Sequence, residues 1–469
     1  MSLAQLEERL AHDLSCLNIG EADWLTPRRH RDEHVHDVVI VGGGQSGLGA
    51  AFGLLRERIA NILVLDENPA GFEGPWDTYA RMATLRTPKH LTSIDFGLPS
   101  LTFRAWWEAQ HGADGWAALG KIPRREWMAY LRWYRRVLRL PVRNDVRVSL
   151  VEPLGGGLHR VHVDGDRPIL ARKVVLATGI QGGGQWHVPE FIRAALPRAR
   201  YAHTSEAIDY AALAGARIAI LGGGASAFDN AHAALTAGVA AAHVFIRRPE
   251  LPQVNPIRFM EQAGIIPRYP ALDDAAKYEL MAAFFRRNQP PTTDMFAAAA
   301  ALPGFALHTG SPWLSVEESD EGAFVTTPKG RFEFDLLVLS TGLVTDPALR
   351  PELALVHNRI LRWKDRYVPS ADVANPLLDA HPYLGPAFEL QPREPADAGL
   401  LRGLFAFNYS ALISLGLSAA AVSGLKHALP RLVGGIADQL FLDDRDAVLA
   451  AYHAYAEPEF TVSAEGRAA

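Results

Sequence analysis

Two glycine-rich segments, 180 residues apart, constrain the fold of this chain more than any other feature. The first, VVIVGGGQSGLGAAFGLL, runs from Val38 to Leu55, and the second, IAILGGGASAFDNAHAAL, runs from Ile218 to Leu235. Each places a glycine turn between an apolar strand and an alanine-rich helix, and a second strand follows each helix. This order predicts parallel strands joined by right-handed crossovers. We therefore expect an α/β protein that contains the same βαβ unit twice.

The first turn matches the pattern G-x-G-x-x-G at Gly42, Gly44 and Gly47. In a dinucleotide-binding turn the first glycine allows the tight bend, the second lets the backbone approach a pyrophosphate, and the third lets the helix pack on the strand. Amides at the helix N-terminus then bind the pyrophosphate. An acid about twenty residues further on is needed for the ribose hydroxyls, and Asp66 lies 19 residues after Gly47. The spacing predicts an adenine dinucleotide without a 2′-phosphate, bound by Gly42, Gly44, Gln45, Ser46, Gly47, Asp66 and Glu67.

The second turn has Gly222 and Gly224, but alanine, Ala227, stands at the third position. The strand that follows it ends at Arg247 and Arg248, where the first unit has its acid. The change removes the ribose acceptor and supplies guanidinium groups for a 2′-phosphate. This predicts NADPH at the second site, with NADH as the alternative coenzyme. The residues predicted to bind it are Gly222, Gly224, Ser226, Ala227, Arg247 and Arg248. A chain with both sites is most simply an enzyme that holds FAD and NADPH for hydride transfer.

Composition narrows the class of protein further. A net charge of −5 over 469 residues makes nucleic acid an unexpected partner. Cys16 is the single cysteine, which excludes an intrachain disulfide and a thiolate metal cage and is compatible with a reducing cytoplasm. The histidines near residue 34 have no compact set of further ligands, so no metal is expected. The N-terminal segment, MSLAQLEERLAHDL, predicts an amphipathic helix rather than a signal peptide.

The C-terminal part contains the longest uncharged run, residues 403–422. Its serines, glycines and Asn408 are unlike a membrane span and predict a buried strand, a loop and a helix. We expect the helix to start at about Ser418 and a separate last helix to follow it. The protein is therefore expected to be soluble, and a homo-oligomer is compatible with the sequence.

Further motifs accompany the two turns. GFEGPW ends at Trp76, and the strand-like segments VVLATG and LLVLSTG end at Gly179 and Gly342. Together with GGGQSG these motifs resemble the two-dinucleotide-domain flavoproteins and, within them, the single-chain (class B) flavin monooxygenases. The resemblance implies two Rossmann-like domains and cofactor contacts by Trp76, Thr178, Gly179, Thr341 and Gly342. Residues 1–180 and 333–469 would form a discontinuous FAD domain with a small helical, substrate-side insertion at about 98–140. Residues 181–332 would form the inserted NADPH domain.

Three stretches resemble the amine N-hydroxylating branch of these enzymes: LRTPKHLTSIDFGLPSLTF, IPRREWMAYLRWY and NYSALISLG. The likeness implies that Lys89 orients a substrate carboxylate and that Asn255, in LPQVNPIRF, contacts NADPH. It also implies that the loop of Asn408, Ser410 and Leu412 covers one edge of the flavin. YAHTSE, with His203, is similar to the family's linker motif but lacks the Phe-x-Gly before the histidine, which argues against a Baeyer–Villiger enzyme.

The resemblance implies a monooxygenase in which NADPH reduces FAD and the flavin captures O2 as a C4a-hydroperoxide. One oxygen atom then passes to a small nucleophile, most plausibly an amine nitrogen. S-oxygenation and ring hydroxylation of an N-heterocycle such as urate remain open, as do a flavin reductase without oxygen insertion and a non-catalytic dinucleotide sensor. The chemistry requires a site that excludes water. The aromatic residues expected to wall it are Trp76, Tyr79, Phe103, Trp106 and Trp107.

Overall fold

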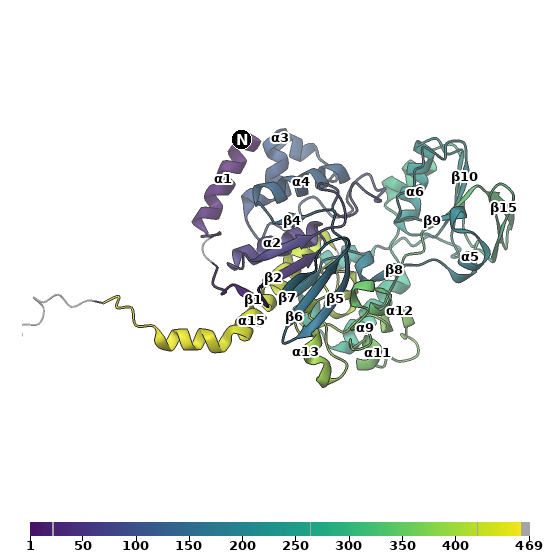
Figure 1. The fold of residues 1–469 in the computed structure, drawn as a ribbon. Helices are drawn as coiled ribbons and strands as arrows, with labels where there is room; N and C mark the ends of the chain where they lie inside the picture. The colour runs from purple at the N-terminus through teal and green to yellow at the C-terminus, as the bar shows by residue number, and fades with distance from the viewer. Residues whose placement is uncertain (21–22, 263, 420, 461–469) are drawn as a thin grey trace, which may run out of the picture.

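The first βαβ unit lies at the centre of an eight-stranded sheet in the computed structural model, which describes residues 1–20, 23–262, 264–419 and 421–460 (Figure 1). Strand β2 (Glu33–Val41) leads through helix α2 (Gln45–Arg56) to β3 (Ile62–Leu65). β2 pairs in parallel with β3 on one side and with β7 (Ile169–Leu176) on the other. The remaining strands of this sheet are β1 (Arg28–His30), β4 (Val142–Arg143), β5 (Val148–Gly155), β6 (Leu158–Val163) and β18 (Leu404–Phe405).

Small residues allow α2 to be buried almost completely between this sheet and a long C-terminal helix, α15 (Val422–Ala454). A Cβ on Gly49 would lie 2.6 Å from the Leu429 side chain of α15, and a Cβ on Gly53 would lie 2.6 Å from Phe96 and Val433. The glycines of the first segment therefore serve helix packing as well as the turn.

The second βαβ unit forms a separate, parallel five-stranded sheet of order β12-β11-β10-β16-β9. Helix α6 (Ala225–Thr236) follows β10 (Arg217–Leu221) and packs against α10 (Thr293–Ala300). The other strands are β9 (Tyr201–His203), β11 (Ala241–Phe245), β12 (Phe305–His308) and β16 (Leu336–Leu339). An antiparallel sheet of β13 (Ser315–Glu318), β14 (Ala323–Thr327) and β15 (Gly330–Phe334) flanks it. The first sheet is mixed, because β1, β5 and β6 pair in antiparallel fashion, but the strands around each βαβ unit are parallel. This arrangement confirms the predicted α/β class with two dinucleotide-binding folds.

The chain passes from the first sheet to the second through β8 (Gly184–Trp186) and returns through β17 (Leu343–Thr345). These two strands pair with each other in antiparallel fashion, so both connections lie side by side. The segment between β11 and α10 also leaves the second sheet: Tyr278 and Met281 share a buried core with Trp363 and Leu412. The helices of this region are α7 (Pro256–Gln262), α8 (Ile265–Arg268), α9 (Asp274–Arg287), α11 (Trp363–Arg366), α12 (Pro376–Asp379) and α14 (Leu412–Leu415).

The predicted helical insertion consists of α3 (Phe103–Ala118) and α4 (Arg124–Val137), and α1 (Leu3–Cys16) packs against α3. Two shorter helices are α5 (Glu190–Ala195) and α13 (Ala398–Leu401). Among the described residues no helix combines the length and the apolar character that crossing a membrane requires.

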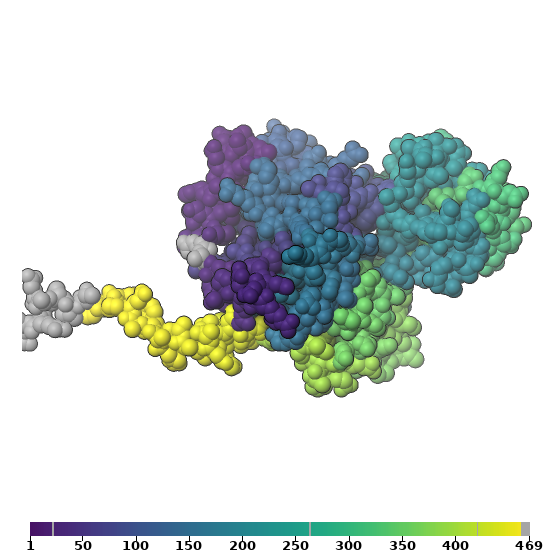
Figure 2. All heavy atoms as spheres, in the orientation of Figure 1, coloured from purple at the N-terminus to yellow at the C-terminus, as the bar shows by residue number. Residues whose placement is uncertain are grey.

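The expected pair of C-terminal helices is wrong: α15 is one helix of 33 residues that continues through Pro430. Its last turns project from the body of the molecule (Figures 1 and 2). Ion pairs hold the helix where it leaves the sheet, with 2.6 Å between Lys173 Nζ and the Asp443 carboxylate and 2.8 Å between Arg172 and Asp444. Lys173 is fully buried, and this burial lowers its pKa to about 8 despite the nearby carboxylate. Such a pair fixes geometry more than it adds stability.

Candidate active site

One cavity of about 1790 Å³ connects the glycine turns of the two βαβ units and collects most of the predicted site residues. The carboxyl ends of β2 and β10 both open into it, which is where parallel sheets place their ligands. Its lining includes Gly42, Gly44, Gln45, Ser46, Asp66, Glu67, Trp76, Thr178, Gly179, Gly222, Gly224, Ser226, Arg247, Arg248, Asn255, Thr341, Gly342, Asn408 and Leu412. The lining does not include Gly47, Lys89, Ala227 and Ser410.

The first turn has the shape that a pyrophosphate requires. Gly42 has φ +108°, and a Cβ on Gly47 would lie 1.8 Å from the Gly42 carbonyl oxygen, so both positions need glycine for the turn itself. Gly44 is different: its Cβ would meet Gly74 only at 3.7 Å, in the space of the cavity. Among the residues that the structure describes, no side chain caps the N-terminus of α2 behind Gly44. The free amides therefore face a cradle that fits a phosphate group.

The sequence predicts that Asp66 and Glu67 bind the ribose hydroxyls, but the two side chains lie in different surroundings. Asp66 is buried and accepts hydrogen bonds from the amides of Gly43 (2.7 Å) and Asn68 (2.8 Å), so its carboxylate braces the turn. Burial raises its pKa, against the effect of these bonds. Glu67 is exposed at the rim of the cavity, 3.6 Å from Arg147. Both carboxylates line the cavity, and the side chain that is free to reach ribose hydroxyls is that of Glu67.

Asn408 organises the loop predicted to cover the flavin. Its amide nitrogen donates to Thr178 Oγ1 (3.2 Å) and to the carbonyls of Leu176 and Gly182, while its oxygen accepts from the amide (2.9 Å) and hydroxyl (2.7 Å) of Ser410. Asn408 is 2% exposed, so its polar groups are engaged within the protein. The Ser410 hydroxyl also belongs to this network. Both side chains therefore hold the loop in place, and neither offers a free reactive group to the cavity.

Trp76 also lines the cavity, and its buried indole N–H has no hydrogen-bond partner among the described residues. Buried donors without partners are rare in proteins, and they point to a ligand that supplies an acceptor. The open cradle at Gly44, the uncapped helix and this donor fit FAD, the cofactor predicted for this turn.

The second turn has the same geometry as the first, except that its third position accepts alanine. Gly222 has φ +131°, and a Cβ there would lie 2.3 Å from the Ser340 carbonyl oxygen. Nothing lies within 4 Å of a Cβ on Gly224, and Ala227 is fully buried behind the turn, so alanine fits at the third position. The N-terminus of α6 also has no side-chain cap. The turn thus fits a second pyrophosphate.

Arg247 and Arg248 both lie at the cavity, but they differ in what they contact. Arg248 donates to the backbone carbonyls of Arg286 (2.9 Å) and Arg287 (3.4 Å). Arg247 is exposed and makes no hydrogen bond or ion pair within the described part of the chain. Arg247 is thus the better placed of the two for the predicted 2′-phosphate contact.

Asn255, Thr341 and Gly342 have local backbone partners. Asn255 accepts at its side-chain oxygen from the Ile257 amide (3.1 Å), at the start of α7. Thr341 donates its hydroxyl to the His187 carbonyl, and the Gly342 carbonyl accepts from the His187 amide (2.9 Å). Asn255 keeps its amide NH2 for a ligand, whereas the Thr341–Gly342 pair fixes the connection through β8 and β17.

Lys89 is not brought together with the other predicted site residues. Its ammonium donates to the carbonyls of Trp116 (2.6 Å) and Leu119 at the C-terminus of α3 and lies 4.8 Å from the centre of the Trp116 ring. A cation in this position satisfies the last carbonyls of a helix. Its placement supports a structural role, and substrate binding by Lys89 stays a prediction without support from the geometry.

Replacing Lys89 with methionine tests this placement. We expect KM for the organic substrate to stay within about twofold, while the loss of the helix cap lowers stability by about 0.3–2 kcal/mol. Steady-state kinetics and the thermal midpoint measure the two effects, and Lys364→Met, at an exposed lysine of α11, is the control. If KM for the organic substrate rises tenfold while the thermal midpoint stays unchanged, Lys89 binds the substrate as the sequence predicts.

The predicted aromatic wall separates into two groups. Trp76 and Tyr79 line the cavity. Phe103 instead packs against Trp106 (5.5 Å between ring centres) and Trp107 (6.0 Å) within the helical insertion, outside the cavity lining. The insertion therefore holds an aromatic core of its own.

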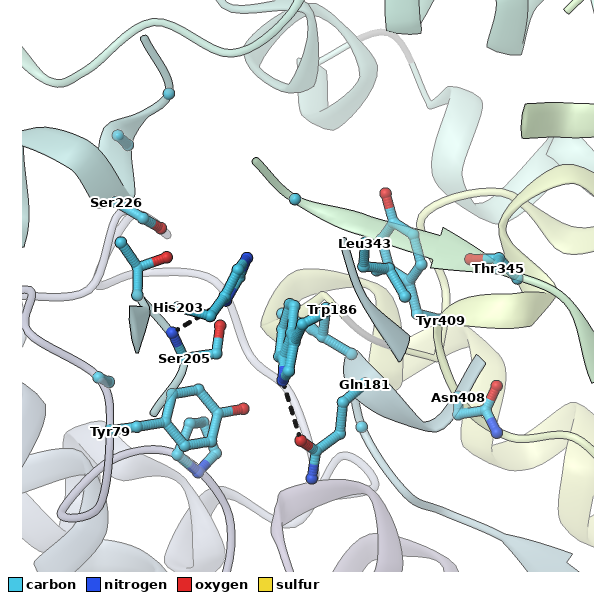
Figure 3. Close-up of a pocket in the computed structure, with 18 of the residues that line it drawn as sticks. Tyr79, Gln181, Trp186, His203, Ser205, Ser226, Leu343, Thr345, Asn408 and Tyr409 are labelled. Carbon is cyan, nitrogen blue, oxygen red and sulfur yellow. Dashed lines mark hydrogen bonds between the residues drawn. The ribbon is translucent and has the colours of Figure 1, made fainter. Parts of the chain in front are cut away.

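The sequence analysis missed Trp186, which the structure places in the lining of the cavity (Figure 3). Its ring stacks on His203 (5.0 Å between centres, 22°) and meets the Tyr79 ring edge-on (6.3 Å, 74°). Its indole N–H donates to Gln181 Oε1 (3.2 Å). No periodic pattern surrounds this tryptophan in QGGGQWHVP, so the sequence alone carried no signal for it.

Comparisons with known proteins identify relatives of the whole chain. The profile of an FAD-NAD(P)-binding family matches residues 39–181, and that of the L-lysine 6-monooxygenase/L-ornithine 5-monooxygenase family matches residues 117–270. The chain is 66% identical, over 98% of both sequences, to an FAD-dependent urate hydroxylase from Xanthomonas campestris. Ornithine hydroxylase from Pseudomonas aeruginosa superposes with a TM-score of 0.68 at 20% identity, covering 87% of this chain and 100% of that chain. L-lysine 6-monooxygenase from Pseudomonas syringae gives 0.66 at 17%, covering 86% and 99%. The solved structures show a shared fold, and the first relative extends the likeness to sequence over the full length.

Proposed function

Because the chain belongs to the single-chain, FAD-dependent monooxygenases, we propose that it hydroxylates urate with NADPH and O2. The assignment of urate as the substrate rests on the 66% identity to the Xanthomonas campestris urate hydroxylase. Amine N-hydroxylation, which the sequence analysis placed first, has support from the lysine and ornithine monooxygenase profile at the level of the family. Ring hydroxylation, its alternative, has the stronger support.

Aromatic side chains in the cavity suit a flat heterocycle. Trp186 and Tyr79 line it, and an aromatic ring can stack on a flat substrate. Lys89, which the sequence analysis expected to bind a substrate carboxylate, lies outside the lining.

Bound FAD, once reduced by NADPH, activates O2 and supplies one oxygen atom to the substrate. The chain's own residues bind, orient and exclude water. The amides behind Gly44 and Gly224 would hold the two pyrophosphates, and the Trp76 indole N–H would donate to the flavin. The Asn408 network fixes the loop that would cover the flavin, and in that position the loop would keep water from the cofactor.

Stoichiometry tests the proposal directly. The purified holoenzyme with NADPH, O2 and urate should consume one NADPH and one O2 per urate, because the second oxygen atom leaves as water. Urate absorbance, NADPH absorbance and an oxygen electrode give the three numbers, and peroxide detection measures the O2 that is reduced without oxygenation. Ornithine, lysine and a thioether, supplied in parallel, should be left unchanged. A hydroxylamine product from an amine with urate untouched would replace the proposal by N-hydroxylation, and NADPH oxidation without any oxygenated product would indicate a reductase.

A cytoplasmic location belongs to the same proposal, as the single cysteine is compatible with it.

A further inference from the structure

We infer that the exposed face of Trp186 is the surface on which the flat ring of the substrate stacks. The inference rests on the proposed function and adds the residues that would select the substrate. Trp186, His203 and Tyr79 are called the Trp186 stack below. They come from three separate segments, namely β8, β9 and the chain after β3, and all three line the cavity.

The Trp186 stack lies between the two expected cofactor sites. In the view of Figure 3, Trp186 and His203 lie between Ser226, at the start of α6, and Tyr409, in the loop that Asn408 organises. The reacting ends of the two dinucleotides must meet between their pyrophosphate cradles, and the substrate must lie within reach of the flavin there. A ring that stacks on Trp186 on the side of Tyr409 meets this requirement.

The indole is fixed before any ligand arrives. His203 covers one face, the Tyr79 ring meets the indole edge-on, and Gln181 accepts its N–H at 3.2 Å. Trp186 nevertheless stays only half-buried, so surface of the indole remains open in the cavity. A ring held in one orientation loses little conformational freedom when a ligand stacks on it, which favours binding.

The polar side chains of the Trp186 stack are neutral, and one of them can donate a hydrogen bond to an oxygen-rich heterocycle. The Ser205 amide donates to Nδ1 of His203 (3.2 Å), so the neutral ring carries its proton on Nε2. Burial lowers the pKa of His203 to about 4, which keeps the ring neutral beneath the indole. Burial also raises the pKa of Tyr79 to about 12, and its hydroxyl has no hydrogen-bond partner in the described ranges of the chain. The phenol is therefore available to donate to a carbonyl oxygen.

Urate matches these features. It is a flat, fused ring with carbonyl oxygens on its edge, so it can stack on an indole and accept from a phenol at once. Stacking of a nucleobase-like ring on an aromatic side chain contributes about 1–3 kcal/mol, which is about 5- to 150-fold in binding. A donated neutral hydrogen bond adds about 2- to 13-fold.

Trp186→Leu removes the stacking surface, Trp186→Phe retains a ring, and Trp24→Leu, at a partly exposed tryptophan far from the cavity lining, is the control. We expect Trp186→Leu to weaken urate binding to the oxidised holoenzyme about 5- to 150-fold by calorimetry, with a parallel rise in KM for urate. KM for NADPH should change less than about threefold. Trp186→Phe should recover most of the affinity, and Trp24→Leu should bind urate as the wild type does.

Tyr79→Phe keeps the ring contact and removes the hydroxyl, so it should weaken urate binding about 2- to 13-fold even if Trp186→Leu fails to fold. Unchanged urate affinity in folded Trp186→Leu, or in Tyr79→Phe, would overturn the inference while wild-type urate turnover preserves the proposed function. A larger rise in KM for NADPH than for urate would assign the indole face to the nicotinamide instead. A wild-type enzyme that leaves urate unchanged would overturn the proposed function and the substrate assigned to Trp186 together.

Discussion

Replacing Gly44 with valine should give a folded protein that contains no FAD. In the absence of cofactor a Cβ at this position meets Gly74 only at 3.7 Å, so the turn itself tolerates a side chain. The added methyl groups fill the cradle in which the pyrophosphate would lie against the backbone. Overlap of this kind costs about 3 kcal/mol or more, which is a loss of at least about 150-fold in affinity. Flavin absorbance after gel filtration measures the occupancy.

Two further glycines separate cofactor loss from unfolding. Gly47→Ala places a methyl group 1.8 Å from the Gly42 carbonyl, so it should lower the thermal midpoint as well as the FAD content. Gly399→Val, in α13, meets nothing within 4 Å and should retain its flavin. A yellow, fully loaded Gly44→Val protein would contradict the placement of FAD at the first turn.

Removing both Arg247 and Arg248 should raise KM for NADPH far more than KM for NADH. The two coenzymes differ by the 2′-phosphate, and each charge-assisted hydrogen bond to it contributes about 1.5–3 kcal/mol. The double alanine variant should therefore raise KM for NADPH about tenfold or more per lost contact, while KM for NADH changes less than about threefold. Steady-state kinetics with both coenzymes measure the ratio.

The single variants sharpen this test. Arg247→Ala should produce a selective loss for NADPH, because Arg247 has no other partner among the described residues. Arg248→Ala should also loosen the end of α9, whose carbonyls it holds. Arg331→Ala, on β15 and paired with Glu317 outside the cavity, is the matched control. Equal effects on both coenzymes would refute the phosphate contact.

The two βαβ units could be predicted because their requirements are local. A tight turn needs Gly42 and Gly222 at positive φ, and a buried parallel strand needs the apolar runs that precede them. Each requirement can be recognised from about twenty consecutive residues of the sequence. The contrast between Gly47 and Ala227 was also visible in the sequence, although its reason, the 1.8 Å approach of the Gly42 carbonyl, is visible only in three dimensions.

The candidate site was predicted less completely because its side chains meet across long stretches of chain. Lys89 was placed at the substrate from a family resemblance, and its partners, the Trp116 and Leu119 carbonyls, depend on how α3 ends. Trp186 stacks on His203 from a different strand. The continuation of α15 through Pro430 likewise depends on packing against α2 rather than on helix propensity.

The helices α7 to α9 have a mechanical consequence. They leave the second parallel sheet and share a buried core, including Tyr278 and Trp363, with the part of the chain between β17 and β18. The paired strands β8 and β17 tie the two sheets together at another point. Because these two strands are the connections themselves, the sheets could turn about the pair, but such a swing would have to break the core around Tyr278 and Trp363. We therefore expect this core to limit how far the two cradles separate during turnover.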